Sequence, residues 1–248
     1  MTVHRSARAF DLAADVYERA RPGYPAEAVH WLVDTLELRP GRVLLDLAAG
    51  TGKLTRPLAR AGARAIAVDP SEPMLAKLRA TVPGAKVHVA TAEELPLADG
   101  SVDAVTVAQA FHWFDHDRAL REVHRVLRPG GRFAIVWNRR DREDPVQAFL
   151  DGVLEPHKRD TPRHREIDTR QVMAASGLFE PVAEKELPND QRLEPGGLVE
   201  RVASTSFIAA LPDGERAHVL ARVEEYESGL PQPVVLPHVT ELFAYARA

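Results

Sequence analysis

The sequence predicts an α/β fold with a doubly wound, mostly parallel sheet, helices on both of its faces and additional cap helices. Between residues 40 and 138, short apolar runs alternate with segments whose apolar residues recur at helical spacing. The short runs are almost continuously apolar, as in parallel strands that are covered on both faces. Repeated strand–helix units of this kind are typical of a parallel sheet between two layers of helices.

The composition narrows the class of protein. Apolar residues make up 45% of the chain and charged residues 27%, as in an ordinary globular protein. The net charge of −4 shows no basic excess, so we expect no general nucleic-acid binding. Cysteine is absent, which excludes disulfides, thiolate nucleophiles and thiolate metal sites. No apolar stretch reaches the ~18 residues of a membrane span and the first residues show no signal-peptide pattern, so we expect a cytoplasmic protein.

Two helices are predicted ahead of the first strand. Residues 9–20 carry apolar side chains at helical spacing, and the "RPGYP" stretch that follows interrupts the pattern. Residues 25–38 form the second helix, and Pro25 suits its first turn because the missing N–H is not needed there. We interpret residues 1–38 as N-terminal lid helices.

The strand–helix units follow in order. Ser71 is a plausible N-cap for the helix after the second strand. The predicted strands are 42–48, 64–70, 85–91, 101–110 and 132–138, and the predicted helices between them are 52–62, 71–82 and 115–127.

The composition changes after residue 138. Charged and proline-containing segments dominate 141–233, which we interpret largely as additions around the sheet that form part of a substrate cap. We expect a helix near 144–154, a strand within 177–193 and two helices within 195–229. Residues 234–248 alternate in polarity and suit a terminal strand. No linker separates these parts, so residues 1–248 are expected to form a single domain.

The stretch "DLAAGTG" at 46–52 has the position of a ligand-binding turn. It follows the first strand and opens a helix, and open α/β sheets bind ligands beyond the carboxyl ends of their strands. Ala48, Gly50 and Gly52 are small, so the backbone can approach a ligand. A dinucleotide fingerprint would also need a small residue at position 53, which is Lys53, and the P-loop pattern is absent. A ligand without a pyrophosphate fits better.

Asp69 ends the second predicted strand. An acid at this place can accept hydrogen bonds from ribose hydroxyls. It could alternatively cap the helix that follows. With the turn at 46–52, the ribose interpretation favours a nucleoside ligand.

Four motifs carry a family resemblance. "DLAAGTGKLT", "VDPSEPML", "ATAEELPLADGSVDAVTVAQAFHWFD" and "EVHRVLRPGG" resemble the successive motifs of class I S-adenosylmethionine-dependent methyltransferases of the type 11 group. The resemblance covers roughly residues 40–138, which would be the cofactor-binding core. "ADVYERARPGYP" resembles the N-terminal segment of the trans-aconitate-methyltransferase-like subgroup. The family implies S-adenosylmethionine as cofactor, S-adenosylhomocysteine as product, and a Rossmann-like seven-stranded sheet with one antiparallel C-terminal strand, for which 239–248 is our candidate.

The resemblance also implies roles for matching residues. Asp46 corresponds to the acid that holds the methionine amino group of the cofactor, often through water, and Asp69 to the ribose ligand. Gln109 and Ala110 end the fourth strand beside the sulfonium. Ala48 stands where the family more usually has glycine. The other positions that match cofactor contacts are Tyr17, Arg21, Gly50, Thr51, Gly52, Pro70, Met74, Ala92 and Glu93.

These other positions divide by the part of the cofactor that they would contact. Residues 50–52 correspond to the backbone turn around the methionine part. Met74 corresponds to an apolar side chain on adenine, although a core position explains it equally well. Residues 92–93 match the adenine edge. Tyr17 and Arg21 correspond to residues that fold over the cofactor, with Arg21 near a carboxylate.

His112 lies just past the fourth strand, where the methyl group is expected to emerge. We interpret it as a general base or a donor that orients the acceptor, although a structural histidine is an equal alternative. Trp113 and Phe114 would form an apolar wall of the substrate pocket, with Tyr24 as a further candidate. His112 and His116 have the spacing of a metal pair but lack the H-E-x-x-H arrangement, so no metal is expected.

The expected function is methyl transfer to a small-molecule acceptor by in-line displacement, with an oxygen or carboxylate acceptor favoured. The N/D-P-P-F/Y signature of many amino-group methyltransferases of nucleic acids and glutamine is absent. An RNA or protein methyltransferase and a non-catalytic cofactor-binding regulator remain alternatives. The sequence leaves the choice between monomer and homodimer open.

Overall fold

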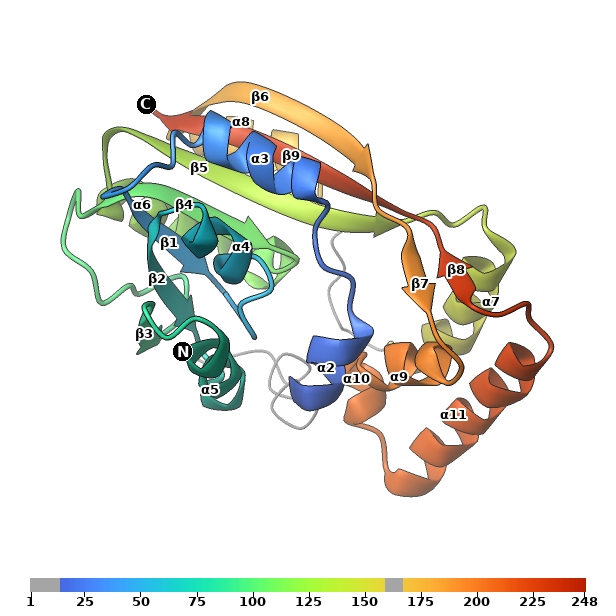
Figure 1. The fold of residues 1–248 in the computed structure, drawn as a ribbon. Coiled ribbons are helices and arrows are strands. Elements are labelled where there is room, and N and C mark those ends of the chain that lie inside the picture. Colours follow the sequence, from blue (N-terminus) through green and yellow to red (C-terminus); the bar gives the residue numbers. More distant parts are fainter. Residues whose placement is uncertain (1–13, 159–166) are drawn as a thin grey trace. The chain divides into compact units, whose positions relative to one another are not determined.

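The computed structural model describes residues 14–158 and 167–248 (Figure 1). Internal contacts divide the chain into two compact units. The first, called the helical unit below, comprises Met1–Pro22, Asn138–Thr161 and Pro188–Val239. The second, called the sheet unit, comprises Gly23–Trp137, Pro162–Leu187 and Thr240–Ala248.

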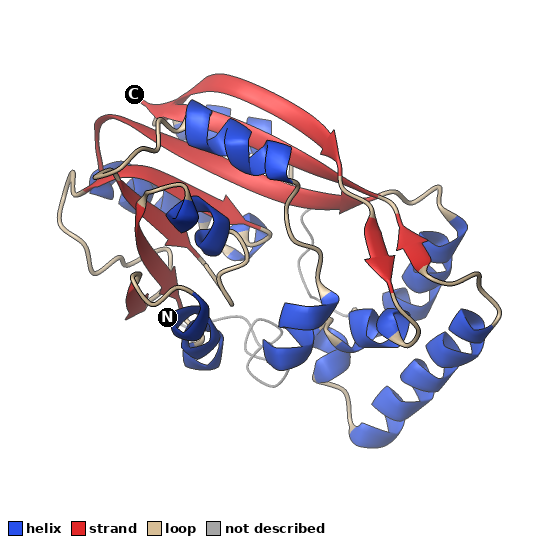
Figure 2. Ribbon diagram, in the orientation of Figure 1, coloured by secondary structure: helices blue, strands red, loops and turns tan. Residues whose placement is uncertain are grey.

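The main sheet has seven strands in the order β3-β2-β1-β4-β5-β9-β6. Its strands are β1 (Val43–Leu47), β2 (Arg64–Asp69), β3 (Lys86–Val89), β4 (Val102–Ala108), β5 (Leu127–Arg140), β6 (Phe179–Pro188) and β9 (His238–Arg247). Pairing is parallel between β1 and β2, β1 and β4, β2 and β3, and β4 and β5. Strand β9 runs opposite to β5 and β6 on either side of it (Figures 1 and 2). The predicted doubly wound fold and its antiparallel terminal strand are confirmed.

The central strands are buried on both faces, which explains their apolar runs. In β1, Leu44 packs into one core cluster, whereas Leu45 and Leu47 pack into another. In β4, Ala104 and Val105 divide in the same way. Successive side chains of a strand point to opposite faces, so each strand supplies apolar residues to two layers.

Helices of the sheet unit follow the predicted order. They are α3 (Ala26–Thr35), α4 (Thr55–Arg60), α5 (Glu72–Thr81), α6 (His116–Val126) and α8 (Thr169–Ser176), with a short 3-10 helix η2 (Phe111–Trp113) after β4. Ser71 is the N-cap of α5, as predicted, because its side chain accepts a hydrogen bond from the backbone N–H of Met74 at 3.3 Å. Pro57 falls in the first turn of α4, where it is tolerated.

The prediction that residues 141–233 lie largely in additions around the sheet is wrong for residues 167–187. These residues belong to the sheet unit and supply α8 and most of β6. Strand β6 ends the sheet, and its residues are mostly exposed or half-buried, so it lacks the apolar run of a central strand. Asp168 is the N-cap of helix α8, and it lies in a charged stretch whose sequence resembles a surface loop.

The helical unit has its own apolar core. It contains α2 (Ala14–Ala20), α7 (Pro145–Leu154), η3 (Glu155–His157), α9 (Gly197–Ala203), α10 (Ser206–Ala209), α11 (Asp213–Ser228), and the antiparallel pair β7 (Gln191–Leu193) and β8 (Val234–Leu236). The first residues of the predicted 9–20 helix lie outside the described residues. Three helices occupy 195–229, where two were expected. None of the described helices is long and apolar enough to span a membrane.

Two buried or half-buried carboxylates hold elements together. Glu227 of α11 accepts hydrogen bonds from the backbone N–H groups of Gly196 and Leu198, at 3.0 and 3.2 Å, and so fixes the start of α9. Asp103 in β4 accepts a hydrogen bond from the backbone N–H of Val43 at 2.6 Å and pairs with Arg42 at 3.0 Å. Asp103 thus joins β4 to the amino end of β1.

Candidate active site

The candidate site lies at the carboxyl ends of β1, β2 and β4. Leu47 in β1 is in register with Val68 in β2 and with Val107 in β4. The residues that follow these three therefore meet at one edge of the sheet. Strand order changes direction between β1 and β4, and open α/β sheets bind ligands at such a switch point.

The turn after β1 has a left-handed backbone at alternate positions. Ala48, Gly50 and Gly52 have φ angles of 54°, 54° and 84°. At Gly52 a Cβ would lie 2.9 Å from the Cγ of Leu78, so glycine is required there. At Gly50 a Cβ would meet nothing within 4 Å, so space for a ligand adjoins the backbone. Ala48 adopts the glycine-like conformation at a cost of about 1–2 kcal/mol.

Asp46 lies in the interior beneath this turn and is 1% exposed. Its two carboxylate oxygens accept hydrogen bonds from Thr55 Oγ1 at 2.5 Å and Thr106 Oγ1 at 2.9 Å. Burial raises the pKa of Asp46 to about 6, and the two threonine hydrogen bonds oppose that rise. The carboxylate therefore has a fixed orientation and is poised to carry charge above that pH.

Asp69 ends β2 and supports the turn from the other side. One carboxylate oxygen accepts a hydrogen bond from the backbone N–H of Gly50 at 2.9 Å, and the other from the backbone N–H of Ser71 at 2.8 Å. The N-cap of α5 is Ser71, so the alternative that Asp69 caps this helix is wrong. Carboxylate oxygens have further lone pairs, which leaves Asp69 able to accept from ribose hydroxyls.

Gln109 follows β4 with a φ of 60°, a second non-glycine residue in the left-handed region at this edge. Its backbone N–H donates to Val136 O at 2.9 Å. Its side-chain Nε2 is buried and has no hydrogen-bond partner among the described residues. The open space at Gly50, the acceptor at Asp69 and this buried donor fit a ligand with ribose and polar groups.

Some of the residues predicted to contact adenine already have other interactions within the protein. Met74 lies in α5 and is 3% exposed. This burial agrees both with a core residue and with a contact to adenine. Glu93 accepts a hydrogen bond from the backbone N–H of Asp115 at 3.0 Å, which ties it to the start of α6. Ala92 is buried and Pro70 is exposed. Their cofactor roles stay predictions.

The segment after Gln109 is aromatic. The ring of His112 lies 4.7 Å from that of Trp113 and 5.5 Å from that of Trp137, measured between centroids. Trp113 and Phe114 pack on the same core cluster, whereas Tyr24 packs on the cluster of the opposite sheet face. The structure therefore joins His112, Trp113 and Phe114 but not Tyr24.

The Nε2 atom of His116 lies 3.0 Å from Phe111 O, so this nitrogen is already engaged by the backbone. Among residues 14–158 and 167–248, no cluster of three His, Asp or Glu could hold a metal ion.

Tyr17 and Arg21 belong to the helical unit rather than to the unit of the other predicted residues. Arg21 donates from Nε to Ser204 Oγ at 2.9 Å and from Nη2 to Thr205 Oγ1 at 3.3 Å. Its guanidinium lies 5.5 Å from the centroid of the Tyr17 ring. Burial lowers the pKa of Arg21 to about 10. Contact of these residues with a cofactor stays a prediction.

A surface hollow of about 830 Å³ lies elsewhere in the sheet unit. Val43, Arg64, Lys86 and Ser101 line it, at or just before the amino ends of β1 to β4. Ligands of open α/β sheets bind at the carboxyl ends, so this hollow does not identify the site.

Sequence reasoning missed several residues of this edge. Thr55 and Thr106 orient Asp46, yet threonine in a strand or at a helix start carries no specific signal. The strained backbone of Gln109 is likewise not readable from the residue type. Gln109 itself was predicted at the site, because the family resemblance places it at the end of the fourth strand.

Comparisons with known proteins agree on one family. The methyltransferase domain family matches residues 45–135. A methyltransferase of Mycobacterium tuberculosis is 40% identical over 93% of this chain and 92% of its own length. A solved methyltransferase structure from Anaeromyxobacter dehalogenans has a TM-score of 0.66 with 28% identity, covering 92% of this chain and 97% of that one.

A further solved structure holds the reaction product of such enzymes. It is geranyl diphosphate C-methyltransferase from Streptomyces coelicolor, in complex with S-adenosylhomocysteine. Its TM-score is 0.53 with 18% identity, covering 90% of this chain and 76% of that one. At this identity the likeness concerns the fold.

The raised pKa of Asp46 predicts a pH dependence of stability. The unfolded value is 3.8, so the folded protein binds the extra proton between about pH 4 and 6. The free energy of unfolding therefore falls as pH rises through this window, by on the order of 2 kcal/mol from this group. Urea denaturation of the wild type and of Asp46→Asn at the two ends of the window measures it. A constant difference between the two proteins would contradict the prediction.

Proposed function

This chain belongs to the class I S-adenosylmethionine-dependent methyltransferases, and on this premise we propose that it methylates a small-molecule acceptor, with oxygen or carboxylate favoured. The observation that carries the proposal is the aromatic segment Phe111–Phe114, which directly follows Gln109 at the candidate edge. An apolar wall at this place suits a compact acceptor. The net charge of −4 favours a small molecule over RNA. We also propose a cytoplasmic location.

S-adenosylmethionine supplies, when bound, a methyl group that is already electrophilic because it is attached to a sulfonium. The task of the protein is therefore placement, and well-oriented reactants can lower a barrier by about 7–11 kcal/mol. The fixed backbone after β1 and β4 serves this task, because both segments are held by hydrogen bonds within the sheet unit.

We propose the following distribution of cofactor contacts. Asp69 accepts from the ribose hydroxyls, and residues 50–52 surround the methionine part. Asp46 faces the amino group, directly or through water, and its negative charge favours the ammonium form. The unpartnered Nε2 of Gln109 donates to an oxygen of the cofactor or of the acceptor.

His112 is our candidate for the residue that acts on the acceptor. It follows the strand end at which the methyl group would emerge, and the rings of Trp113 and Trp137 restrict its position. A hydroxyl acceptor must lose a proton, and a positioned base typically adds ~10²–10⁴ in rate. A carboxylate acceptor needs no base, and His112 would then only orient it.

The acceptor atom is the least constrained part of the proposal. The solved relative from Streptomyces coelicolor is named as a C-methyltransferase. Carbon nucleophiles therefore belong in the test beside oxygen nucleophiles.

Substituting Asp69→Asn is expected to weaken cofactor binding by about 10–100-fold, because hydrogen bonds to a charged acceptor contribute about 1.5–3 kcal/mol. Isothermal titration with S-adenosylhomocysteine measures the change. The matched control is Asp103→Asn, which alters a carboxylate near the amino end of β4, at the opposite edge of the sheet from Asp69. The control should lose stability but keep cofactor affinity. Equal losses in both variants would contradict the role of Asp69.

A labelled-methyl screen tests the proposed acceptor class. The purified protein is incubated with radiolabelled S-adenosylmethionine and with carboxylic acids, phenols, carbon nucleophiles, a metabolite extract, RNA and protein. We expect label in a small-molecule fraction. Label that is transferred only to RNA or protein would overturn the small-molecule proposal.

With an acceptor in hand, His112→Ala is expected to lower turnover by ~10²–10⁴ for a hydroxyl acceptor while cofactor affinity is kept. His30→Ala, which changes an exposed histidine of α3, is the matched control and should leave turnover unchanged. Unchanged turnover and cofactor affinity in His112→Ala would show that His112 has no catalytic role.

A further inference from the structure

A buried arginine of the helical unit has no counter-ion among the described residues. Arg201 lies near the end of α9 and is 9% exposed. Its Nε has no hydrogen-bond partner among the described residues. The guanidinium groups of Arg21 and Arg140 act on it repulsively, and the smaller electrostatic effect of Tyr17 opposes them. Burial, reinforced by these two cations, holds the pKa of Arg201 well below its usual range.

Three buried acceptor atoms of the same unit are also unpartnered within the described residues. They are Gln147 Oε1, Gln191 Oε1 and His238 Nε2. All three side chains are at most 8% exposed. Buried polar atoms are normally satisfied, so four such atoms in one small unit indicate a polar ligand or ordered water.

Hydrogen bonds connect these side chains with the segments around His238, Arg21 and Arg201. Gln147 Nε2 donates to Pro237 O at 3.1 Å, next to His238. Gln191 Nε2 donates to Ala20 O at 2.8 Å, next to Arg21. Arg21 in turn donates to Ser204 O, three residues beyond Arg201.

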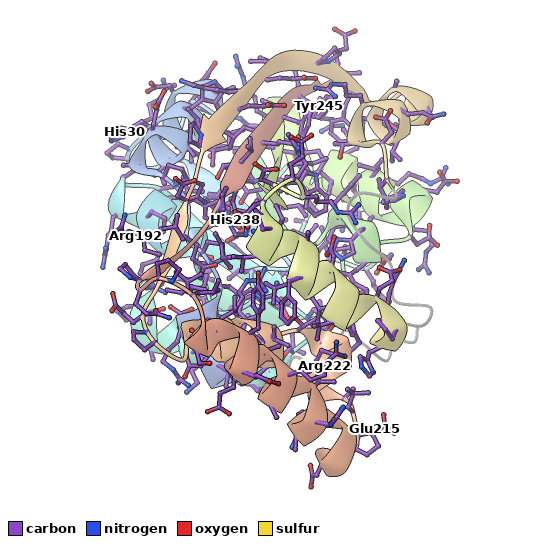
Figure 3. The ribbon with its side chains drawn as sticks, turned by 90° about the vertical axis from the view of Figure 1, so that its right-hand side faces the viewer. His30, Arg192, Glu215, Arg222, His238 and Tyr245 are labelled. Carbon is purple, nitrogen blue, oxygen red and sulfur yellow. The ribbon has the colours of Figure 1, made fainter. Side chains whose placement is uncertain are left out.

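The protonation state of the His238 ring determines which hydrogen-bonding group a ligand must supply at this position. Its Nδ1 lies 2.9 Å from Leu236 O, and a carbonyl can only accept, so Nδ1 carries the hydrogen. Burial and the charge of Arg201 lower the pKa of His238 to about 4, which keeps the ring neutral. Its Nε2 therefore presents a lone pair at the start of β9 (Figure 3).

An uncompensated buried cation is costly, and no carboxylate among the described residues compensates Arg201. Asp151 forms an ion pair with Arg140 at 2.6 Å and therefore does not serve as the counter-ion of Arg201. The missing negative charge is therefore expected from a ligand.

We propose that this part of the helical unit binds a small hydroxy acid, with its carboxylate on Arg201 and its hydroxyl groups toward His238 and the two glutamines. That this acid is the methyl acceptor rests on the function proposed above. A doubly charged phosphate fits less well, because its unprotonated oxygens cannot donate hydrogen bonds to the three acceptor atoms of Gln147, Gln191 and His238. A hydroxy acid offers one negative charge for the guanidinium and hydrogen-bond donors for the three acceptors.

The key variant is Arg201→Met, which keeps an unbranched side chain similar to the aliphatic part of arginine and removes the charged guanidinium. Arg192→Met is the matched control, because Arg192 lies in the same unit on β7 and is exposed (Figure 3). Thermal unfolding and titration calorimetry are carried out with the monoanionic hydroxy acids lactate, glycerate and gluconate, which carry increasing numbers of hydroxyl groups, and with inorganic phosphate, with and without S-adenosylhomocysteine.

The hydroxy acids are expected to bind and stabilise the wild type and Arg192→Met, and to bind Arg201→Met at least about 10-fold more weakly. Without ligand, Arg201→Met should unfold at a higher temperature than the wild type, because an uncompensated charge has been removed. Arg201→Lys should bind with intermediate affinity, and it keeps the test valid if the methionine variant does not fold.

Three results would overturn the site. The first is no saturable binding of any of these acids to the wild type. The second is equal binding by all variants, with Arg201→Met less stable, which would indicate a structural arginine. The third is a loss of S-adenosylhomocysteine affinity alone in Arg201→Met, which would assign the guanidinium to the methionine carboxylate of the cofactor.

The experiments distinguish a failure of the proposed acid site from a failure of the proposed methyltransferase function. An acid that binds through Arg201 without receiving label supports the site and counts against its role in methyl transfer. Methylation of a small acid that is unaffected by Arg201→Met supports the function and overturns the site.

Discussion

The candidate site depends on a single buried carboxylate. Asp46 is enclosed where β1 meets β4, and two threonine hydroxyls hold its oxygens. Because Thr55 belongs to α4 and Thr106 to β4, these two bonds connect the strand before the turn, the helix after it and the neighbouring strand. Burying a carboxylate is unfavourable unless it is hydrogen-bonded. The two ends of the turn at 48–52 are therefore held in place, which restricts the conformation of the backbone between them.

Backbone strain is concentrated at the same edge. Ala48 and Gln109 follow adjacent strands, and both adopt left-handed conformations without being glycine. Such residues cost on the order of 1–3 kcal/mol each and persist only where the surrounding structure determines them. The apolar layers on both faces of the sheet supply that support. The strain agrees with a site whose main contribution is placement of two reactants.

Much of the fold was predictable, because central parallel strands need apolar side chains on both faces. Strands such as β1 and β4 and the N-cap Ser71 follow from this pattern and from local hydrogen bonding. The edge strand β6 has only one protected face, so its sequence looks like surface. Asp69 was identifiable from its place at a strand end. The threonines around Asp46 and the buried Arg201 were not, because their importance arises from contacts between distant parts of the chain.

The helical unit is assembled from three separate stretches of chain, Met1–Pro22, Asn138–Thr161 and Pro188–Val239. Recombination at a single crossover point would therefore divide it. A chimaera that is meant to import this unit from a relative must exchange all three stretches together, and a library that varies one stretch changes only part of the unit. The same interleaving means that insertions during evolution could diversify this unit loop by loop while the order of strands in the sheet stayed constant.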